Sequence, residues 1–187
     1  MSIQANHRFP ASCHGNIVHL VLVLALTPCA LAANTGRLDQ EDDIREVVLR
    51  HLLSNNEYAA RGERFDGYYL SFGLRERPKK TVDPLDVFRE RLTDPSDAFM
   101  KRFVDHKATV HKASFCRVGA MGGVLDRRTG KPGLLLSVTT ITWLSDTEAK
   151  VSADYYRANL ASAGFTYWVK KEDRKWKVAE QKMDWIS

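Results

Sequence analysis

The fold of this 187-residue chain is decided by its C-terminal third, which closes on Tyr167-Trp168-Val169-Lys170-Lys171-Glu172-Asp173-Arg174-Lys175-Trp176-Lys177-Val178. Apolar residues alternate with polar ones on both sides of the central Glu-Asp-Arg, which is typical of two strands joined by a tight turn. The alternation places Trp176 and Val178 on one face, as partners for Tyr167 and Val169 on the neighbouring strand. The whole region from Gly133 to Trp185 therefore reads as four consecutive antiparallel strands.

The two earlier strands of this region are expected at 134–144 and 148–160, with turns at 145–147 and 161–164. In the second of them Val151, Ala153 and Tyr155 share one face, which we assign to the core. The opposite face carries the polar residues Lys150, Ser152, Asp154 and Tyr156. This alternation predicts that Asp154 faces solvent and pairs with a neighbouring lysine.

An amphipathic helix is expected near the start of the domain. Asp39 is a plausible N-cap, followed by acids in the first turn, and Asn55-Asn56 marks an end. A single stripe at helical spacing runs through Ile44, Val47, Val48, His51 and Leu52. We expect this stripe to lie on the sheet, with His51 inside or at its edge.

The segment between helix and sheet carries shorter elements. An aromatic strand is expected at 67–73, and two helix starts of the form Asp-Pro-x-Asp follow at Asp83 and Asp94. A further strand is expected from Val110 to Val118, with residues 119–133 as a glycine-rich connection. Together these elements predict an α+β fold: an N-terminal helix against a curved, long-stranded antiparallel, cone-like sheet, with short helices after the first strand.

The N-terminus resembles a secretory leader. An apolar run at 17–26 follows a region with one arginine and no acid, and Ala30-Leu31-Ala32 offers small residues for cleavage. We therefore predict a signal peptide at residues 1–32, cleavage between Ala32 and Ala33, and one exported domain at 33–187, periplasmic or secreted. A membrane anchor is the rival interpretation, but the run is shorter than the roughly 20 residues that a spanning helix needs. Lipidation at Cys29 is the other alternative.

Composition narrows the class of protein. The leader holds one basic residue and no acid, so the remaining chain has 27 Lys and Arg against 23 Asp and Glu, a net charge of +4. This mild, mixed charge does not indicate a nucleic-acid binder. Cys116 is the one cysteine outside the leader, so no disulfide within the domain is expected, and a buried thiol is its default role.

The order of elements, and most sharply the hairpin from Tyr167 to Val178, resembles the nuclear transport factor 2-like (cystatin-like) superfamily. The resemblance implies a sheet curled around the first helix, with a pocket at the open end of the cone. Such a pocket serves cyclases, isomerases, dehydratases and non-catalytic binding or assembly domains, so the fold alone leaves function open.

Candidate residues follow from this expected cone. The aromatic and histidine side chains expected to line a cavity are His51, Tyr69, Phe72, Trp143, Tyr155 and Tyr167, together with Tyr68 and Trp168; packing in the core is the alternative role for each. No catalytic constellation is evident, and His111 and Asp154 are the candidates for an isomerase- or dehydratase-like site. No metal site and no cofactor are expected.

Three functions remain open on sequence alone. A non-catalytic domain that binds a small ligand or a protein is favoured, because no chemistry-bearing set of residues emerges. A small-molecule enzyme using the cone pocket and an assembly component of the cell envelope are the alternatives. The expected partner is an unidentified small ligand or protein, and the chain is compatible with a homodimer; nucleic acid and a stable membrane span are not expected.

Overall fold

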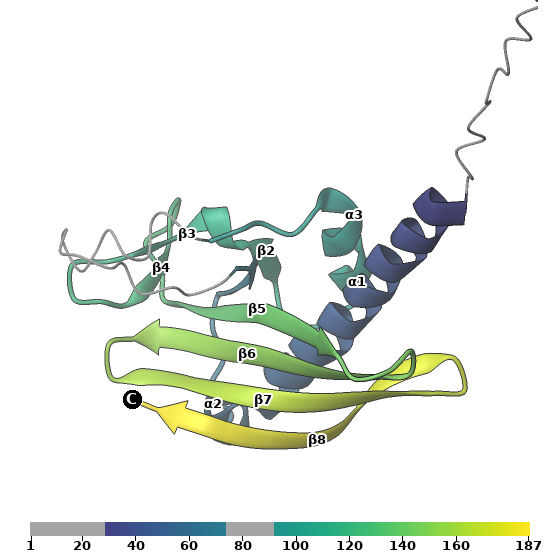
Figure 1. Cartoon of the computed structure of the whole chain (residues 1–187). Coiled ribbons are helices and arrows are strands. Elements are labelled where there is room, and N and C mark those ends of the chain that lie inside the picture. Colours follow the sequence, from purple (N-terminus) through teal and green to yellow (C-terminus); the bar gives the residue numbers. More distant parts are fainter. Residues whose placement is uncertain (1–28, 74–91) are drawn as a thin grey trace, which may run out of the picture.

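The computed structural model describes residues 29–73 and 92–187, with side-chain surroundings from residue 36 onward. Figure 1 shows one long helix crossing a sheet. The helices are α1 (Cys29–Asn55), α2 (Glu57–Ala60) and α3 (Asp97–Met100), with short 3-10 helices at Lys101–Phe103 and Ala113–Phe115. The strands are β1 (Gly67–Phe72), β2 (Val110–Lys112), β3 (Cys116–Val118), β4 (Val124–Asp126), β5 (Gly133–Trp143), β6 (Glu148–Ala158), β7 (Ala161–Glu172) and β8 (Lys175–Ile186).

The main sheet has the strand order β2-β1-β5-β6-β7-β8, and its last four strands form the expected antiparallel series. The α+β class is therefore confirmed. The expectation of a wholly antiparallel sheet is wrong, because β1 pairs in parallel with both β2 and β5. A parallel pair cannot be joined by a hairpin, so β1, β2 and β5 all enter the sheet from the same end. The sheet is open, with β2 and β8 at its edges.

The apolar stripe of α1 packs on the sheet as predicted. Ile44, Val48, Leu49 and Leu52 are almost fully buried and belong to one core cluster with sheet residues such as Tyr155. Burying an aliphatic side chain of this size contributes about 1.5–3 kcal/mol. This face of the helix therefore holds α1 against the sheet.

The start of α1 was wrongly predicted. The helix begins at Cys29, directly after Pro28, so Asp39 lies inside it rather than at its N-cap. Alanine and leucine dominate residues 30–33 and are strong helix formers. The acids expected to interact with the helix dipole instead pair with a neighbour along the helix: Arg45 binds Glu41 at 2.9 Å and Asp42 at 3.1 Å.

The β7–β8 hairpin agrees with the sequence pattern around its turn. Glu172 lies opposite Lys175, and the two residues between them have positive φ, 49° at Asp173 and 64° at Arg174. Two consecutive left-handed residues are the geometry of a two-residue hairpin turn. Trp176 is 6 % exposed while Lys175 and Lys177 are exposed, which confirms the predicted alternation.

Two other turns differ from prediction. Residues 161–164 belong to β7 and the chain reverses at 159–160, because Ala158 already pairs with Ala161. The helix start at 94–97 is capped by Ser96, whose Oγ accepts from the Phe99 amide at 3.1 Å. Asp94 instead accepts from the backbone and hydroxyl of Ser114. The similar start expected at Asp83 lies outside the described residues.

The segment from 110 to 118 is not one strand. A 3-10 turn at Ala113–Phe115, held by the Ser114 contacts to Asp94, separates β2 from β3, and β3 then pairs with β4 inside the expected connection. This hairpin contributes to a second core cluster on the sheet face opposite α1; its buried members are Tyr69, Ala113, Cys116, Val124, Leu135 and Tyr156. Tyr156 lies on the predicted face but is buried there, and the predicted burial of Cys116 is confirmed.

Candidate functional site

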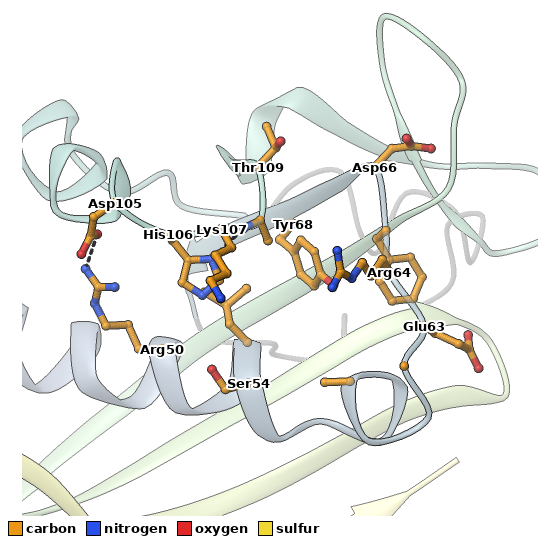
Figure 2. Close-up of a pocket in the computed structure, with 15 residues that line it drawn as sticks. Arg50, Ser54, Glu63, Arg64, Asp66, Tyr68, Asp105, His106, Lys107 and Thr109 are labelled. Carbon is orange, nitrogen blue, oxygen red and sulfur yellow. Dashed lines mark hydrogen bonds and ion pairs between the residues drawn. The ribbon is translucent and has the colours of Figure 1, made fainter.

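A pocket of about 730 Å³ lies between the C-terminal half of α1, the region from α2 to β1, and the segment 105–109 (Figure 2). Asn56 turns the chain at its base: its Oδ1 accepts from the amides of Tyr58 and Ala59, and its Nδ2 donates to the carbonyl of Leu52. On the opposite side, the Tyr68 amide donates to the Thr109 carbonyl at 3.0 Å. These bonds hold segments that are distant in sequence around one space.

Apolar and aromatic side chains form the inner wall of this pocket. Leu53 and Tyr68 line it and are buried in the main core, and half-buried Phe65 lies beside them. The Phe65 ring meets the rings of Tyr58 and Tyr68 edge-on, at centroid distances of 5.4 and 5.7 Å. Such edge-to-face contacts fix ring positions, so this wall is preformed.

Every carboxylate that lines the pocket already has a cationic partner. The pairs are Glu63 with Arg61 (3.1 Å) and Arg157 (3.5 Å), Asp66 with Lys131 (3.3 Å), and Asp105 with Arg50 (2.9 Å). The hydrogen bond from Arg50 lowers the pKa of Asp105 below its ordinary value. Arg61, Arg157 and Lys131 do not line the pocket, so the charges of Glu63 and Asp66 are balanced from outside it.

Two lining cations have no such partner. Within the described ranges, neither Arg64 nor Lys107 lies within ion-pair distance of a carboxylate. In Figure 2 both side chains point into the space between α1 and β1, from different sides. Next to Lys107, His106 accepts from the Ala108 amide through Nδ1 at 3.2 Å, so in the neutral ring Nε2 carries the proton and is a donor. The pocket therefore offers donors and positive charge beside an aromatic wall.

Of the residues predicted to line a cavity, all but Tyr68 lie outside this pocket. His51 lies at the edge of the α1 stripe, as expected, and donates through Nε2 to the Gln181 side chain at 2.8 Å. Its ring meets Tyr167 edge-on at 5.6 Å. Tyr155 and Tyr167 are about 1 % exposed in the main core, and burial raises the pKa of both hydroxyls. These two tyrosines therefore pack in the core, which was the alternative role given for them.

The other predicted aromatics are spread over the molecule. Phe72 packs edge-on against Phe99, and Trp143 against Trp176. Trp168 is half-buried, with the Lys150 ammonium 5.7 Å from its ring centre. Only Tyr68, among the aromatics singled out from the sequence, lines the pocket.

Tyr69 points to the opposite face of the sheet. Its hydroxyl donates to Asp126 at 2.8 Å, and its ring lies over Gly67 and Gly133, where an added Cβ would collide with it. Burial raises the pKa of the Tyr69 hydroxyl, and the bond to Asp126 raises it further. This contact fastens the loop after β4 to the sheet.

The catalytic candidates do not meet. Both lie on the sheet face away from α1, but His111 is on β2 and Asp154 on β6, three strands away in the sheet order. At roughly 4.8 Å per strand this separates them by about 14 Å, too far for a His–Asp pair. His111 stacks between Tyr69 and Phe115, at 5.7 and 6.1 Å. Asp154 is only 6 % exposed, so its predicted solvent position is wrong, although its face is correct.

Sequence reasoning missed Arg64 and Lys107. Each stands in a charged, irregular segment, where an ordinary solvated cation is the default interpretation. No periodicity links residue 64 to residue 107, so the chain carries no local signal for their convergence.

Comparison with family models, with curated proteins and with solved structures gives no match. Across residues 29–73 and 92–187, no three His, Cys, Asp or Glu side chains gather in an arrangement that could hold a metal ion. Over the same ranges, no helix is long and apolar enough to cross a membrane.

Proposed function

We propose that this protein is an exported, non-catalytic binding domain that holds a small anionic ligand in the pocket between α1, β1 and the segment 105–109. The observation that carries the proposal is the pair of cations, Arg64 and Lys107, that point into this pocket without a carboxylate partner in the described chain. Its volume of about 730 Å³ lies within the range of roughly 300–1,000 Å³ typical of small-ligand sites.

The two sides of the pocket suit two parts of one ligand. A carboxylate or phosphate group would accept hydrogen bonds from Arg64 and Lys107, and from Nε2 of His106. An apolar body would lie against Phe65, Tyr68 and Leu53. Charge supplies orientation and the aromatic wall supplies buried area, which is the usual division of roles in a small-molecule site.

Binding is favoured over catalysis because no acid–base pair lies in this pocket. Its carboxylates are held in ion pairs, and the two catalytic candidates of the sequence lie elsewhere and far apart. Export rests on the leader-like N-terminus, and the nuclear transport factor 2-like resemblance rests on the element order and the Tyr167–Val178 hairpin. A helix laid on one face of an α+β sheet is compatible with that resemblance.

The test uses a matched pair of probes, naphthalene-1-carboxylate and its uncharged amide, titrated calorimetrically into the purified protein. We expect the carboxylate to bind more tightly, and Arg64→Gln or Lys107→Gln to weaken it by about tenfold each. Hydrogen bonds to charged groups are worth about 1.5–3 kcal/mol, and tenfold corresponds to about 1.4 kcal/mol. Lys170→Gln, an exposed lysine on β7, is the control and should change nothing. Equal binding of the two probes, or an unaltered affinity in both pocket variants, would refute the proposal.

A further inference from the structure

Strand β8 forms one edge of the main sheet and is long for an edge strand. It spans Lys175–Ile186, and only β7 pairs with it in the described part of the chain. Edge strands with unpaired backbone groups are templates for pairing with another strand, and proteins usually shorten or cover them. An exposed edge of this length therefore needs either protection or a partner.

The backbone of β8 points outward at alternate residues. The backbone N–H of Lys171 donates to the Thr147 carbonyl, on the β6 side of β7. Because backbone groups alternate in direction along a strand, the N–H and C=O groups of the even-numbered residues of β7 point toward β8. On β8, Glu180 lies opposite Trp168 and Lys182 lies opposite Thr166, so the backbone groups of these two residues hydrogen-bond to β7. Gln181 lies between these two residues, so its backbone N–H and C=O point away from β7, toward the open edge of the sheet.

Two bulges interrupt β8, at Ala179 and Asp184, as the register shifts show. Bulges at an edge normally discourage pairing. Here they flank a regular stretch, Glu180–Met183, rather than break it. This stretch is the part of the edge best shaped to accept another strand.

The side chains of this stretch are self-complementary. The Gln181 side chain binds His51 on the α1 side, so Glu180 and Lys182 both project from the opposite face. If a second copy pairs antiparallel with the two-fold axis at Gln181, Glu180 of each copy lies opposite Lys182 of the other. Glu180 has no ion pair within the described residues, and Lys182 has only a loose one, 3.7 Å to Asp184.

Exposed apolar residues extend the same edge. Met183 and Ile186 are 51 % and 61 % exposed, and Trp185 is 41 % exposed, with its indole over Gly164. Scattered exposed apolar residues are ordinary, but Met183 and Ile186, opposite Phe165 and Ala163, lie on the same face of this open edge. A second strand beside β8 would cover Met183 directly, because Met183 is two residues from the axis.

We infer that two copies of this chain pair through β8, antiparallel and centred on Gln181, to form one continuous twelve-stranded sheet with reciprocal Glu180–Lys182 contacts. A C2 pairing of this kind is the commonest symmetry of soluble homo-oligomers. The proposal is independent of the pocket, because none of the residues that line the pocket lies on β8.

Sedimentation equilibrium of the full-length protein over about 1–200 µM tests the inference. We expect a monomer–dimer equilibrium in the wild type, and a rise in the dissociation constant of at least about tenfold for Lys182→Glu and for Glu180→Lys. Each single change puts like charges opposite each other in two symmetric pairs. The double variant Glu180→Lys/Lys182→Glu restores opposite charges and should dimerise within about threefold of the wild type.

The control is Lys170→Glu, a charge reversal at an exposed lysine one strand away from the edge; it breaks the ion pair of Lys170 with Glu148 but should leave dimerisation as in the wild type. Circular dichroism of each variant checks that the fold is retained, and an unfolded variant is replaced by its Gln counterpart, for which a smaller rise is expected. A wild type that stays monomeric to 200 µM overturns the inference. Single variants that dimerise normally, or a double variant that does not recover, overturn it equally.

Discussion

Replacement of Trp176 by alanine tests the hairpin on which the fold depends. Trp176 is 6 % exposed, packs in the main core and meets Trp143 edge-on at a centroid distance of 5.6 Å. The neighbouring residues on β8, Lys175 and Lys177, are exposed. The same strand therefore supplies both the sensitive site and its controls.

The magnitude follows from the buried ring. An aromatic side chain buries about 150–250 Å², which at about 25 cal/mol per Å² corresponds to roughly 4–6 kcal/mol as an upper bound. The contact with Trp143 adds about 0.5–1.5 kcal/mol. Against this, Nε1 of Trp176 has no acceptor within the described residues, and loss of such a buried donor relieves about 1–3 kcal/mol. We expect a net loss of about 3–5 kcal/mol for Trp176→Ala.

Urea denaturation followed by circular dichroism measures this change in the free energy of unfolding. Trp176→Phe keeps most of the buried area and removes the unpaired N–H, so it should cost less than about 1.5 kcal/mol. Lys175→Ala should cost less than about 0.5 kcal/mol. A Trp176→Ala variant as stable as Lys175→Ala, or a Phe variant as damaged as the Ala variant, would refute the reasoning.

Three further predictions concern the turn, a carboxylate and the thiol. Arg174 has a φ of 64°, a left-handed conformation that costs a residue with a side chain about 1 kcal/mol. Arg174→Gly should therefore stabilise the protein by about 0.5–1 kcal/mol in the same urea assay, whereas the control Lys175→Gly should not stabilise it. The pKa of Asp126 lies far below its ordinary value because the Thr129 amide and the Tyr69 hydroxyl donate to it. A lowered folded-state pKa stabilises the protein above the unfolded pKa of about 3.9, so Asp126→Asn should lower stability at pH 6, and the difference should shrink as the pH falls below about 4; a difference that persists unchanged at pH 2 would contradict this. Burial raises the pKa of Cys116 to about 12 and its Sγ donates to the Ala113 carbonyl, so iodoacetamide at pH 8 should leave Cys116 unmodified by mass spectrometry until denaturant is added.

Local patterns predicted the parts of this fold that depend on near neighbours in the chain. Alternation located the four strands from Gly133 onward and turned Trp176 inward, and helical spacing identified the buried stripe of α1. The same reasoning placed the start of α1 eleven residues late, because an acidic residue resembles an N-cap whether or not strong helix formers precede it. It also misjudged the exposure of Asp154, because alternation tells which face a residue occupies but not whether that face is covered.

The sequence by itself determined the α+β class, the antiparallel series β5–β8, the turn at Asp173-Arg174 and the inward position of Trp176. All of these arise from backbone geometry and side-chain spacing within a few residues. Only the tertiary structure decided the parallel pairing of β1, the second core under β3 and β4, and the placement of Arg64 and Lys107 around one pocket with an aromatic wall. These features require segments far apart in the chain to come together, and burial of apolar surface, which drives that assembly, is non-directional and leaves no periodic trace in the sequence.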